Sequence, residues 1–244
     1  MEKPVTLVTG VSKGIGKTIA EDLTARGHHV VGLSRTPPGS WFKGSFVAVD
    51  LADADATREA LQRVTREHKV LRLVSNAGIV RAAPLEKLTV KDLDEVIAVN
   101  VRALMQCAQA VLPGMRAAKF GRIVNLGSRA SLGRETRIVY GGSKAMVASL
   151  TRSLALEVAR DGITVNCIAP GPIGTEMFDG NHPAGSPQRE RITAAVPMAR
   201  VGTTGEVAAR APISSPTTPA SRRGRCCMCA AACRSAPRRC SMPA

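Results

Sequence analysis

Short apolar runs alternate with amphipathic stretches of helical length along most of this chain. Six runs rich in Val, Ile and Leu have the length of buried strands: residues 5–9, 30–33, 46–49, 70–74, 123–126 and 163–168. The segments between them, among them residues 15–26, 53–68 and 139–160, have the length and spacing of helices. Strands separated by helices form a parallel sheet with right-handed crossovers. The pattern therefore predicts a three-layer α/β domain with a doubly wound parallel sheet.

The longest amphipathic stretch begins near Val90 and predicts a helix with one buried face. Its apolar positions keep the i, i+3, i+4, i+7 spacing: Leu93, Val96, Ile97, Val101, Leu104, Ala108, Val111 and Leu112. Asn100 lies within this mostly apolar helix. Its amide is either a hydrogen-bonded part of the core or a group with a function of its own.

A glycine-rich turn, Thr9-Gly10-Val11-Ser12-Lys13-Gly14-Ile15-Gly16, joins the first predicted strand to the first predicted helix. Glycines there let the backbone approach a pyrophosphate, whose charge then faces the amide groups and the positive end of the helix. In a doubly wound sheet, ligands bind beyond the carboxyl ends of the strands. The turn therefore predicts a dinucleotide site in a Rossmann fold, although glycines also end strands where no ligand binds.

Composition divides the chain into two chemically different parts. Of its 244 residues, 44% are apolar, which is enough for one full-sized domain with a buried core. The net charge is +15, but residues 210–244 hold seven arginines and no acidic residue, so the remainder is only mildly basic. One Trp, one Tyr and four Phe are too few to build a stacking surface for single-stranded nucleic acid. We therefore expect no specific nucleic-acid partner.

The cysteines and the apolar runs predict a cytoplasmic location. Two cysteines lie in residues 1–209, which fits a reducing cytosol, and the other five lie in residues 210–244. No apolar run approaches the roughly 20 residues that span a bilayer, and no signal peptide opens the sequence. We therefore expect no association with a membrane.

Further motifs follow the predicted strands in order. Asp50-Leu51 ends the third strand, Ser75-Asn76-Ala77-Gly78 ends the fourth, and Pro170-Gly171 follows the sixth. Ser128 follows the fifth strand, twelve residues before a Tyr140-x-x-x-Lys144 sequence. Together with the glycine turn, these motifs resemble those of the short-chain dehydrogenase/reductase family over about residues 4–209. Within that family the chain is most similar to the bacterial 3-oxoacyl-acyl carrier protein reductases.

The resemblance implies four catalytic residues: Asn100, Ser128, Tyr140 and Lys144. It assigns proton donation to Tyr140, contact with the cofactor ribose to Lys144, and a water-mediated proton relay to Asn100. A phenol with a pKa near 10 is a poor acid–base catalyst at neutral pH, and a neighbouring ammonium favours its ionised form. Because Tyr140 and Lys144 are i and i+4 on one helix face, we expect Lys144 to lower the pKa of Tyr140. Ser128 is placed to hydrogen-bond the substrate oxygen, where negative charge develops.

The cofactor is expected to be NADP(H) rather than NAD(H). The second strand ends in Ser34-Arg35-Thr36, without the acid that binds the ribose hydroxyl in NAD-preferring relatives, and Lys13 adds a second cation. The alternative is that both cations are solvated surface charges. The resemblance implies that the cofactor is bound by Gly10, Ser12, Lys13, Gly14, Ile15, Gly16, Ser34, Arg35, Asp50, Leu51, Asn76, Ala77, Gly78, Tyr140, Lys144, Pro170, Gly171, Ile173 and Thr175.

The substrate is implied only as a class: a small-molecule ketone, secondary alcohol or acyl thioester, with acyl carrier protein as a further partner. Residues 173–200 are expected to cover the nicotinamide as a lid, with His182 as a polar loop residue. Arg129, Arg134 and Arg137 crowd the loop between Ser128 and Tyr140. They either receive an anionic substrate or carrier, or are solvated loop residues. Family members are homotetramers or dimers, and the same assembly is expected here unless the C-terminal residues disrupt it.

Residues 210–244 depart from the family pattern, which continues with a helix, a loop and a final strand. Codons for residues 224–233 can be chosen so that a second frame reads as that strand. Whatever the choice, the pair Cys226-Cys227 forces Leu in that frame and Met228-Cys229 forces Val. We therefore expect a frameshift near residues 208–212, a poorly ordered tail, and a sheet without its last strand.

Two other interpretations of this tail are a zinc site and a basic arm. A zinc site is disfavoured because the tail has no His and no pair of C-x-x-C motifs, so we expect no metal. A basic arm that binds phosphates non-specifically stays open. If the altered tail prevents catalysis, the alternative function is a dinucleotide-binding protein without turnover.

Overall fold

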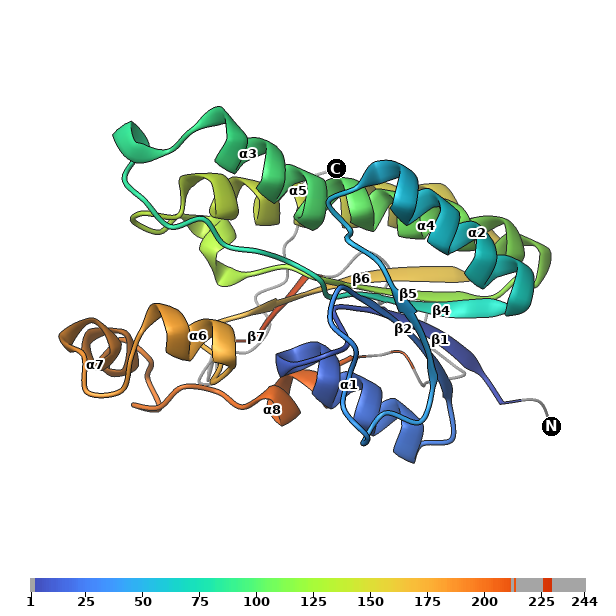
Figure 1. The fold of residues 1–244 in the computed structure, drawn as a ribbon, viewed down its shortest axis with the longest axis horizontal. Coiled ribbons are helices and arrows are strands. Elements are labelled where there is room, and N and C mark those ends of the chain that lie inside the picture. The colour runs from blue at the N-terminus through green and yellow to red at the C-terminus, as the bar shows by residue number, and fades with distance from the viewer. Residues whose placement is uncertain (1–2, 212, 214–225, 230–244) are drawn as a thin grey trace.

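A computed structural model describes residues 3–211, 213 and 226–229 and contains a seven-stranded parallel sheet (Figure 1). In chain order the strands are β1 (Val5–Thr9), β2 (His29–Ser34), β3 (Ser45–Ala48), β4 (Val70–Ser75), β5 (Gly121–Leu126), β6 (Ile163–Pro170) and β7 (Cys226–Cys229). Within the sheet they lie in the order β3-β2-β1-β4-β5-β6-β7. The strand order changes direction between β1 and β4, and such a switch point leaves a crevice at the carboxyl ends of the strands.

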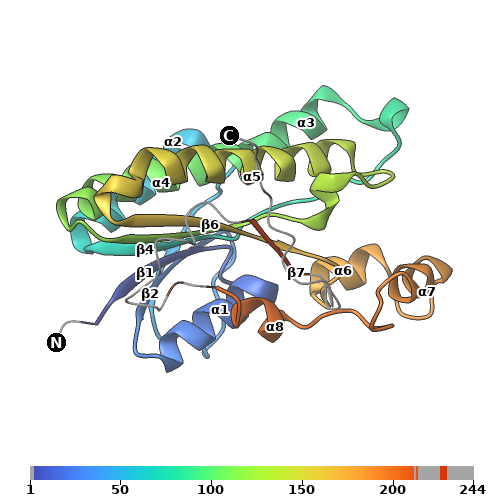
Figure 2. The ribbon, with the colours of Figure 1, turned by 180° about the vertical axis from the view of Figure 1, so that it is seen from behind.

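The helices form a layer on each face of the sheet (Figures 1 and 2). They are α1 (Gly14–Ala25), α2 (Ala54–Glu67), α3 (Val90–Ile97), α4 (Ala103–Ala117), α5 (Ile138–Val158), α6 (Glu176–Asn181), α7 (Pro187–Ala194) and α8 (Thr204–Ala208). α2, α4 and α5 cover one face, whereas α1 and α8 cover the other. α6 and α7 lie beyond the carboxyl ends of the strands. The predicted three-layer Rossmann fold is confirmed.

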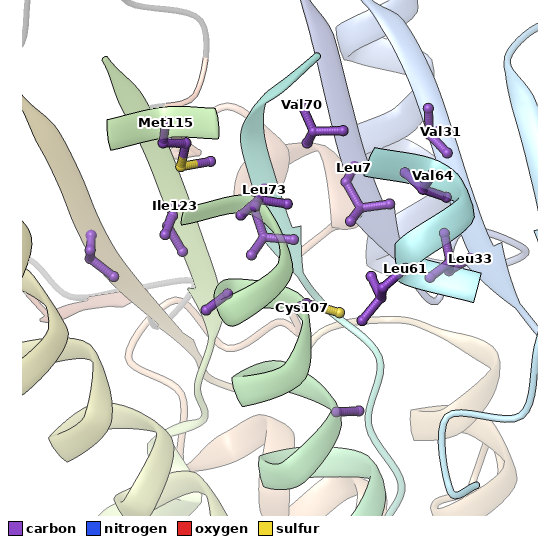
Figure 3. Packing of buried hydrophobic residues seen from close by; sticks show 14 of the residues in the cluster. Leu7, Val31, Leu33, Leu61, Val64, Val70, Leu73, Cys107, Met115 and Ile123 are labelled. Atoms are coloured by element: carbon purple, nitrogen blue, oxygen red, sulfur yellow. The ribbon is translucent and has the colours of Figure 1, made fainter. Parts of the chain in front are cut away.

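Alternate residues of the central strands face opposite helix layers, as the two-residue period of a strand requires. One buried cluster contains Leu7, Leu73 and Ile123 together with Leu61 and Val64 of α2 and Cys107 and Met115 of α4 (Figure 3). The next residue of each of these strands points the other way, so Val8, Val74 and Val124 pack with Ile19 and Leu23 of α1 and with Val207 of α8. The strands are therefore apolar on both faces, which explains why they appear in the sequence as continuous apolar runs.

The long amphipathic stretch is helical from Val90 to Ala117 but is interrupted by a π-helical turn, Ala98–Arg102. Leu93, one of its predicted core positions, is 44% exposed because α3 packs mainly on α5 and not on the sheet. Within the described residues this is the one helix that is long and apolar enough to cross a membrane. Half of its most apolar window is buried inside the domain, as in other core helices of this composition, so it is weak evidence for a membrane span.

The expectation that the sheet lacks its last strand is wrong. β7 pairs in parallel with β6, with Cys167 opposite Cys226 and Pro170 opposite Cys229. A free sheet edge presents backbone N–H and C=O groups that pair with any extended segment, so this pairing does not require the side chains of the family's strand. Most of residues 210–244, for which the sequence predicts poor order, lie outside the described residues.

Candidate active site

A cavity of about 810 Å³ opens at the carboxyl ends of the strands, at the switch point between β1 and β4. Its walls are the turns that follow the first six strands, together with residues of α3, α5, α6 and α7. Of the residues predicted to be catalytic or to bind the cofactor, all but Gly16 and Asn100 line it. The volume lies in the upper part of the range for small-molecule sites, which suits an extended ligand.

The turn after β1 holds its backbone close to the cavity. Gly10 and Gly14 have φ angles of 69° and 58°, a left-handed conformation that favours glycine. Gly16 lies behind them, and a Cβ at this position would be 2.2 Å from the carbonyl oxygen of Gly10. The missing side chain of Gly16 therefore allows α1 to begin directly against the turn.

Asn76 connects this turn with the turn after β4. Its Nδ2 donates to the carbonyl oxygens of Thr9 and Gly10, at 3.0 and 3.1 Å. In return the Thr9 Oγ1 accepts hydrogen bonds of 3.0 Å from the backbone N–H groups of Asn76 and Ala77. These four bonds fix the relative position of the two turns that meet at the switch point.

This end of the cavity fits the phosphates of a dinucleotide. The glycine turn leads into the N-terminus of α1, whose first turn contains no acidic residue. The free amide groups and the positive end of the helix dipole therefore face an anion without a competing carboxylate on the helix. Lys13, which precedes α1, is exposed and lines the same cavity.

Ser128, Tyr140 and Lys144 converge on the cavity from two elements. Tyr140 and Lys144 lie on α5, with the Lys144 Nζ 5.9 Å from the centre of the Tyr140 ring. Ser128 follows β5 and begins the 3₁₀ turn Arg129–Leu132. A Cβ on Gly141 would lie 2.8 Å from the carbonyl oxygen of Ala130. Glycine at this position therefore lets α5 approach the Ser128 turn.

The electrostatic environment of Tyr140 differs from the sequence prediction. Burial raises the pKa of Tyr140, while a hydrogen bond with Ser128 and the charges of Arg137 and Arg134 act in the opposite direction. The Lys144 ammonium instead donates a hydrogen bond of 2.7 Å to the carbonyl oxygen of Leu126. The net shift of the Tyr140 pKa is therefore upward and not downward as expected, and the cations that favour the phenolate in this structure are arginines. The contribution of Lys144 stays a prediction.

Burial lowers the pKa of Lys144 from 10.5 to about 8. Between these values the unfolded chain binds a proton that the folded protein does not, so Lys144 makes the free energy of unfolding rise with pH in this window. Below pH 8 the full cost of burying the charge is present. We expect the stability of Lys144→Met relative to the wild-type protein to fall by on the order of 3 kcal/mol from pH 8 to pH 10.5, measured by urea unfolding.

The exposed Lys91 on α3 provides the matched control for this measurement. Its ammonium stays in water in both states, so Lys91→Met should change stability by the same amount at both ends of the pH range. Equal pH dependence in the two variants would show that Lys144 is solvated in the folded protein.

Asn100 lies in the π-helical turn, and hydrogen bonds satisfy its buried side chain. Its Oδ1 accepts from the backbone N–H of Ile79 at 2.8 Å, and its Nδ2 donates to the Ile79 carbonyl at 3.1 Å and to the Ser143 Oγ at 3.0 Å. Asn100 therefore holds the segment after β4 against α5, and its contact on α5, Ser143, directly precedes Lys144. Asn100 and Lys144 also border a space of about 10 Å³, at the lower limit of the space that holds one water. The relay role of Asn100 stays a prediction.

The end of β2 carries the cation predicted to recognise a phosphate on the ribose. Arg35 is exposed and lines the cavity, with its Nη1 4.0 Å from the Oδ2 of Asp50 at the end of β3. An exposed ion pair at this distance is weak. The Ser34 hydroxyl donates to the carbonyl oxygen of Thr36 at 2.9 Å and so stabilises the bend that presents Arg35.

The sequence did not identify Arg137 and His182 as buried residues of the cavity wall. They are 8% and 3% exposed, respectively. The His182 Nδ1 lies 3.2 Å from the Oε1 of Gln188, and its ring packs on Phe178, so it joins α6 to α7 within the predicted lid. The burial of a loop residue leaves no periodic pattern in the sequence. The one available signal for Arg137 was the presence of three arginines in the short loop between Ser128 and Tyr140.

The chain was compared with known proteins. A family model described as short chain dehydrogenase matches residues 4–184. The 3-oxoacyl-[acyl-carrier-protein] reductases FabG of Vibrio cholerae and Escherichia coli are 35% and 34% identical to it, in each case over 85% of this chain, and the matches cover 88% and 87% of those proteins.

Solved structures agree with these sequence relatives. A 3-oxoacyl (acyl-carrier-protein) reductase from Agrobacterium tumefaciens with NADP bound has a TM-score of 0.85 at 29% identity, covering 94% of this chain and 93% of that one. The aldohexose dehydrogenase of Thermoplasma acidophilum has a TM-score of 0.86 at 27% identity, covering 100% and 98%. The chain therefore belongs to the short chain dehydrogenase family and is an NAD(P)-dependent oxidoreductase.

Proposed function

We propose that this protein interconverts a ketone and a secondary alcohol with NADP(H), with Tyr140 as the proton donor and acceptor. The observation that carries the proposal is the convergence of Ser128, Tyr140 and Lys144 on the cavity that also contains the glycine turn. FabG-like 3-oxoacyl thioesters are the first substrate class to test, because the curated relatives bear that name.

The chain offers a separate binding group for each part of the dinucleotide. The amides of the glycine turn and the N-terminus of α1 would hold the pyrophosphate. Arg35 and Lys13 would hold a phosphate on the adenosine ribose, and Asp50-Leu51 the adenine. Pro170 ends β6 and is followed along the cavity wall by Gly171, Ile173 and Thr175, and these four residues would hold the nicotinamide. When bound, the nicotinamide supplies or accepts the hydride.

Residues of this chain stabilise and protonate the substrate oxygen. In the direction of reduction, Tyr140 donates its phenolic proton to that oxygen, and in oxidation it takes the proton back. The Ser128 hydroxyl donates a hydrogen bond to the same oxygen, where negative charge develops. Burial keeps Tyr140 protonated at neutral pH, so it is an acid in the resting protein. Arg137 and Arg134 offset part of the cost of forming the phenolate.

The proposal is tested by following NADPH oxidation over a panel of 3-oxoacyl thioesters, 3-oxo esters and simple ketones. Turnover with any member supports a carbonyl reductase, and preference for the carrier-linked thioester supports a FabG-like activity. Binding of NADPH without turnover of any member would instead support the alternative of a catalytically impaired protein.

Arg35 provides a test of the preference for NADP(H). A charge-assisted hydrogen bond to a phosphate contributes about 10- to 100-fold in affinity. We expect Arg35→Gln to weaken NADPH binding by that factor and to leave NADH binding unchanged, as measured by fluorescence titration of each nucleotide. Arg63→Gln, at an exposed position on α2 outside the cavity, is the control with the same loss of charge. An equal effect of Arg35→Gln on both nucleotides would contradict the assignment.

We also propose that residues 210–244 are a separate, out-of-frame segment. The abrupt loss of acidic residues after Glu206 and the alternative reading of codons 224–233 support this. Sequencing the encoding DNA from independent isolates across codons 208–212 tests it. One intact frame in all isolates would end the proposal.

A further inference from the structure

Arg137 is a buried cation from which the reaction proposed above uses only the charge that lies near Tyr140. It precedes the first residue of α5, is 8% exposed, and lines the same cavity as Tyr140. The hydrogen bonds that the structure gives it run from Nη1 to the carbonyl oxygen and the Oγ1 of Thr136, at 3.2 and 3.0 Å. Neither acceptor is charged. Burying a guanidinium next to neutral groups alone is costly, and burial correspondingly lowers the pKa of Arg137.

The surroundings of Arg137 add positive charge. Arg134 is close enough to lower the pKa of Arg137 further. Burial lowers the pKa of His182 in the lid, and the charges of both arginines act in the same direction. Within the described residues, neither Arg134 nor Arg137 forms an ion pair with a carboxylate. This part of the cavity wall therefore has uncompensated positive charge.

The acidic residues that line the cavity lie elsewhere. Asp50 follows β3 and faces Arg35, and Glu95 of α3 pairs with Arg81. Glu176, in the first turn of α6, lies near Gly14 at the turn that would hold the pyrophosphate. The lid residue Arg189 is already paired with Asp179, at 2.7 Å. Glu135, in the same loop, does not line the cavity, and no described carboxylate forms an ion pair with Arg137.

We propose that Arg137, assisted by Arg134, binds a carboxylate of the substrate, so that the protein acts on oxo acids or hydroxy acids in preference to neutral ketones. The inference rests on the function proposed above and specifies its substrate class. A guanidinium matches a carboxylate with two parallel hydrogen bonds. The anion would also lie at the N-terminus of the 21-residue helix α5, where the helix dipole favours negative charge.

The position of Arg137 limits the distance between the carboxylate and the reacting carbon. Arg137 and Tyr140 are three residues apart at the start of α5, and side chains with this spacing begin about 5–6 Å from one another. The carboxylate is therefore only a few bonds from the carbonyl that Tyr140 protonates. The phosphate of a pantetheine carrier lies at the far end of a long arm and does not meet this requirement.

The experiment compares pairs of substrates that differ only in charge. The pairs are acetoacetate with its methyl ester and levulinate with its methyl ester, and acetoacetyl-coenzyme A represents the carrier-linked source of negative charge. For the wild-type protein we expect kcat/KM to be about 10- to 100-fold higher for the acid than for the ester in the preferred pair. Arg137→Gln should bring this ratio close to one, and Arg134→Gln should lower it by a smaller factor. Arg152→Gln, on an exposed part of α5 outside the cavity, should leave it unchanged.

The ratio separates substrate binding from general damage to the site. Loss of positive charge near Tyr140 affects acid and ester alike and cancels in the ratio. An unchanged ratio in Arg137→Gln, or equal wild-type activity on acid and ester, would overturn the inference while leaving the reductase function intact. A fall in activity on acetoacetyl-coenzyme A alone, with the acid unaffected, would assign the arginines to a carrier phosphate and overturn it as well.

Reduction of none of the ketones would contradict the proposed function. The carboxylate site is then tested by a binding measurement that needs no turnover. 3-Hydroxybutyrate and its methyl ester are titrated into protein saturated with NADPH, where both partners are reduced and no reaction follows. Tighter binding of the acid that is lost in Arg137→Gln and restored in part by Arg137→Lys supports the carboxylate site. Equal binding of acid and ester excludes it.

Discussion

Tyr140→Phe is expected to lower kcat by roughly 10²- to 10⁴-fold and to leave the affinity for NADPH unchanged. The substitution removes one hydroxyl group and keeps the ring that packs beside Lys144, 5.9 Å from its Nζ. The phenol donates the proton in the proposed reaction. Ser128, on a neighbouring turn, can donate a hydrogen bond but is too weak an acid to replace Tyr140 as the proton donor. Steady-state turnover and fluorescence titration of NADPH with the same preparation measure the two quantities.

A chemical feature of the chain makes this residue easy to follow. Tyr140 is the only tyrosine in the sequence, so the ultraviolet absorbance of the phenolate reports on its ionisation alone. Because burial is the largest influence on the pKa of Tyr140, the free protein should ionise above the ordinary value of tyrosine. Turnover retained in Tyr140→Phe would exclude this residue as the acid, whatever the titration shows.

Gly16→Ala is expected to abolish measurable NADPH binding and to destabilise the fold. A Cβ at this position would lie 2.2 Å from the Gly10 carbonyl oxygen and 2.4 Å from the Asn76 Nδ2. Neither atom can move alone, because Asn76 also holds the turns after β1 and β4 together. Overpacking of this kind costs about 1–3 kcal/mol, and a displacement of the turn by about 1 Å can lower the function of a site by 10²-fold. Urea unfolding and nucleotide titration measure the two effects.

Gly114→Ala is the matched control, since it adds the same methyl group to a glycine within a helix. Nothing lies within 4 Å of a Cβ at position 114, in α4. Alanine is favoured over glycine in a helix interior, so this variant should gain up to about 1 kcal/mol of stability with NADPH binding unchanged. If Gly16→Ala behaved in the same way, the close contact of α1 with the glycine turn would be disproved.

Most of the architecture could be predicted because its signals are local. Apolar runs of strand length, separated by amphipathic helices, predicted the order of elements and both helix layers. The glycine turn is equally local, since Gly10 and Gly14 adopt conformations that favour glycine and directly precede a helix. The π-helical turn at Asn100 was not predictable, because it interrupts the helix without a proline or glycine to mark it.

The last strand shows where a sequence pattern fails. Residues 226–229 have neither the alternation nor the side chains of the expected strand, and the sheet was predicted to end at β6. Pairing at a sheet edge depends on backbone groups and on the edge that is available, and a one-dimensional pattern contains no record of that edge.

The chain's own sequence determined the fold, the family and the set of groups that meet at the switch point, because each depends on residue type and on spacing over a few turns of the chain. The tertiary structure alone decided how those groups are charged and partnered. Lys144 donates to the Leu126 carbonyl, Asn100 holds Ile79 and Ser143, and Arg137 is buried beside Tyr140. Burial and the nearest charge set a pKa, and both depend on segments far apart in the sequence that only packing brings together.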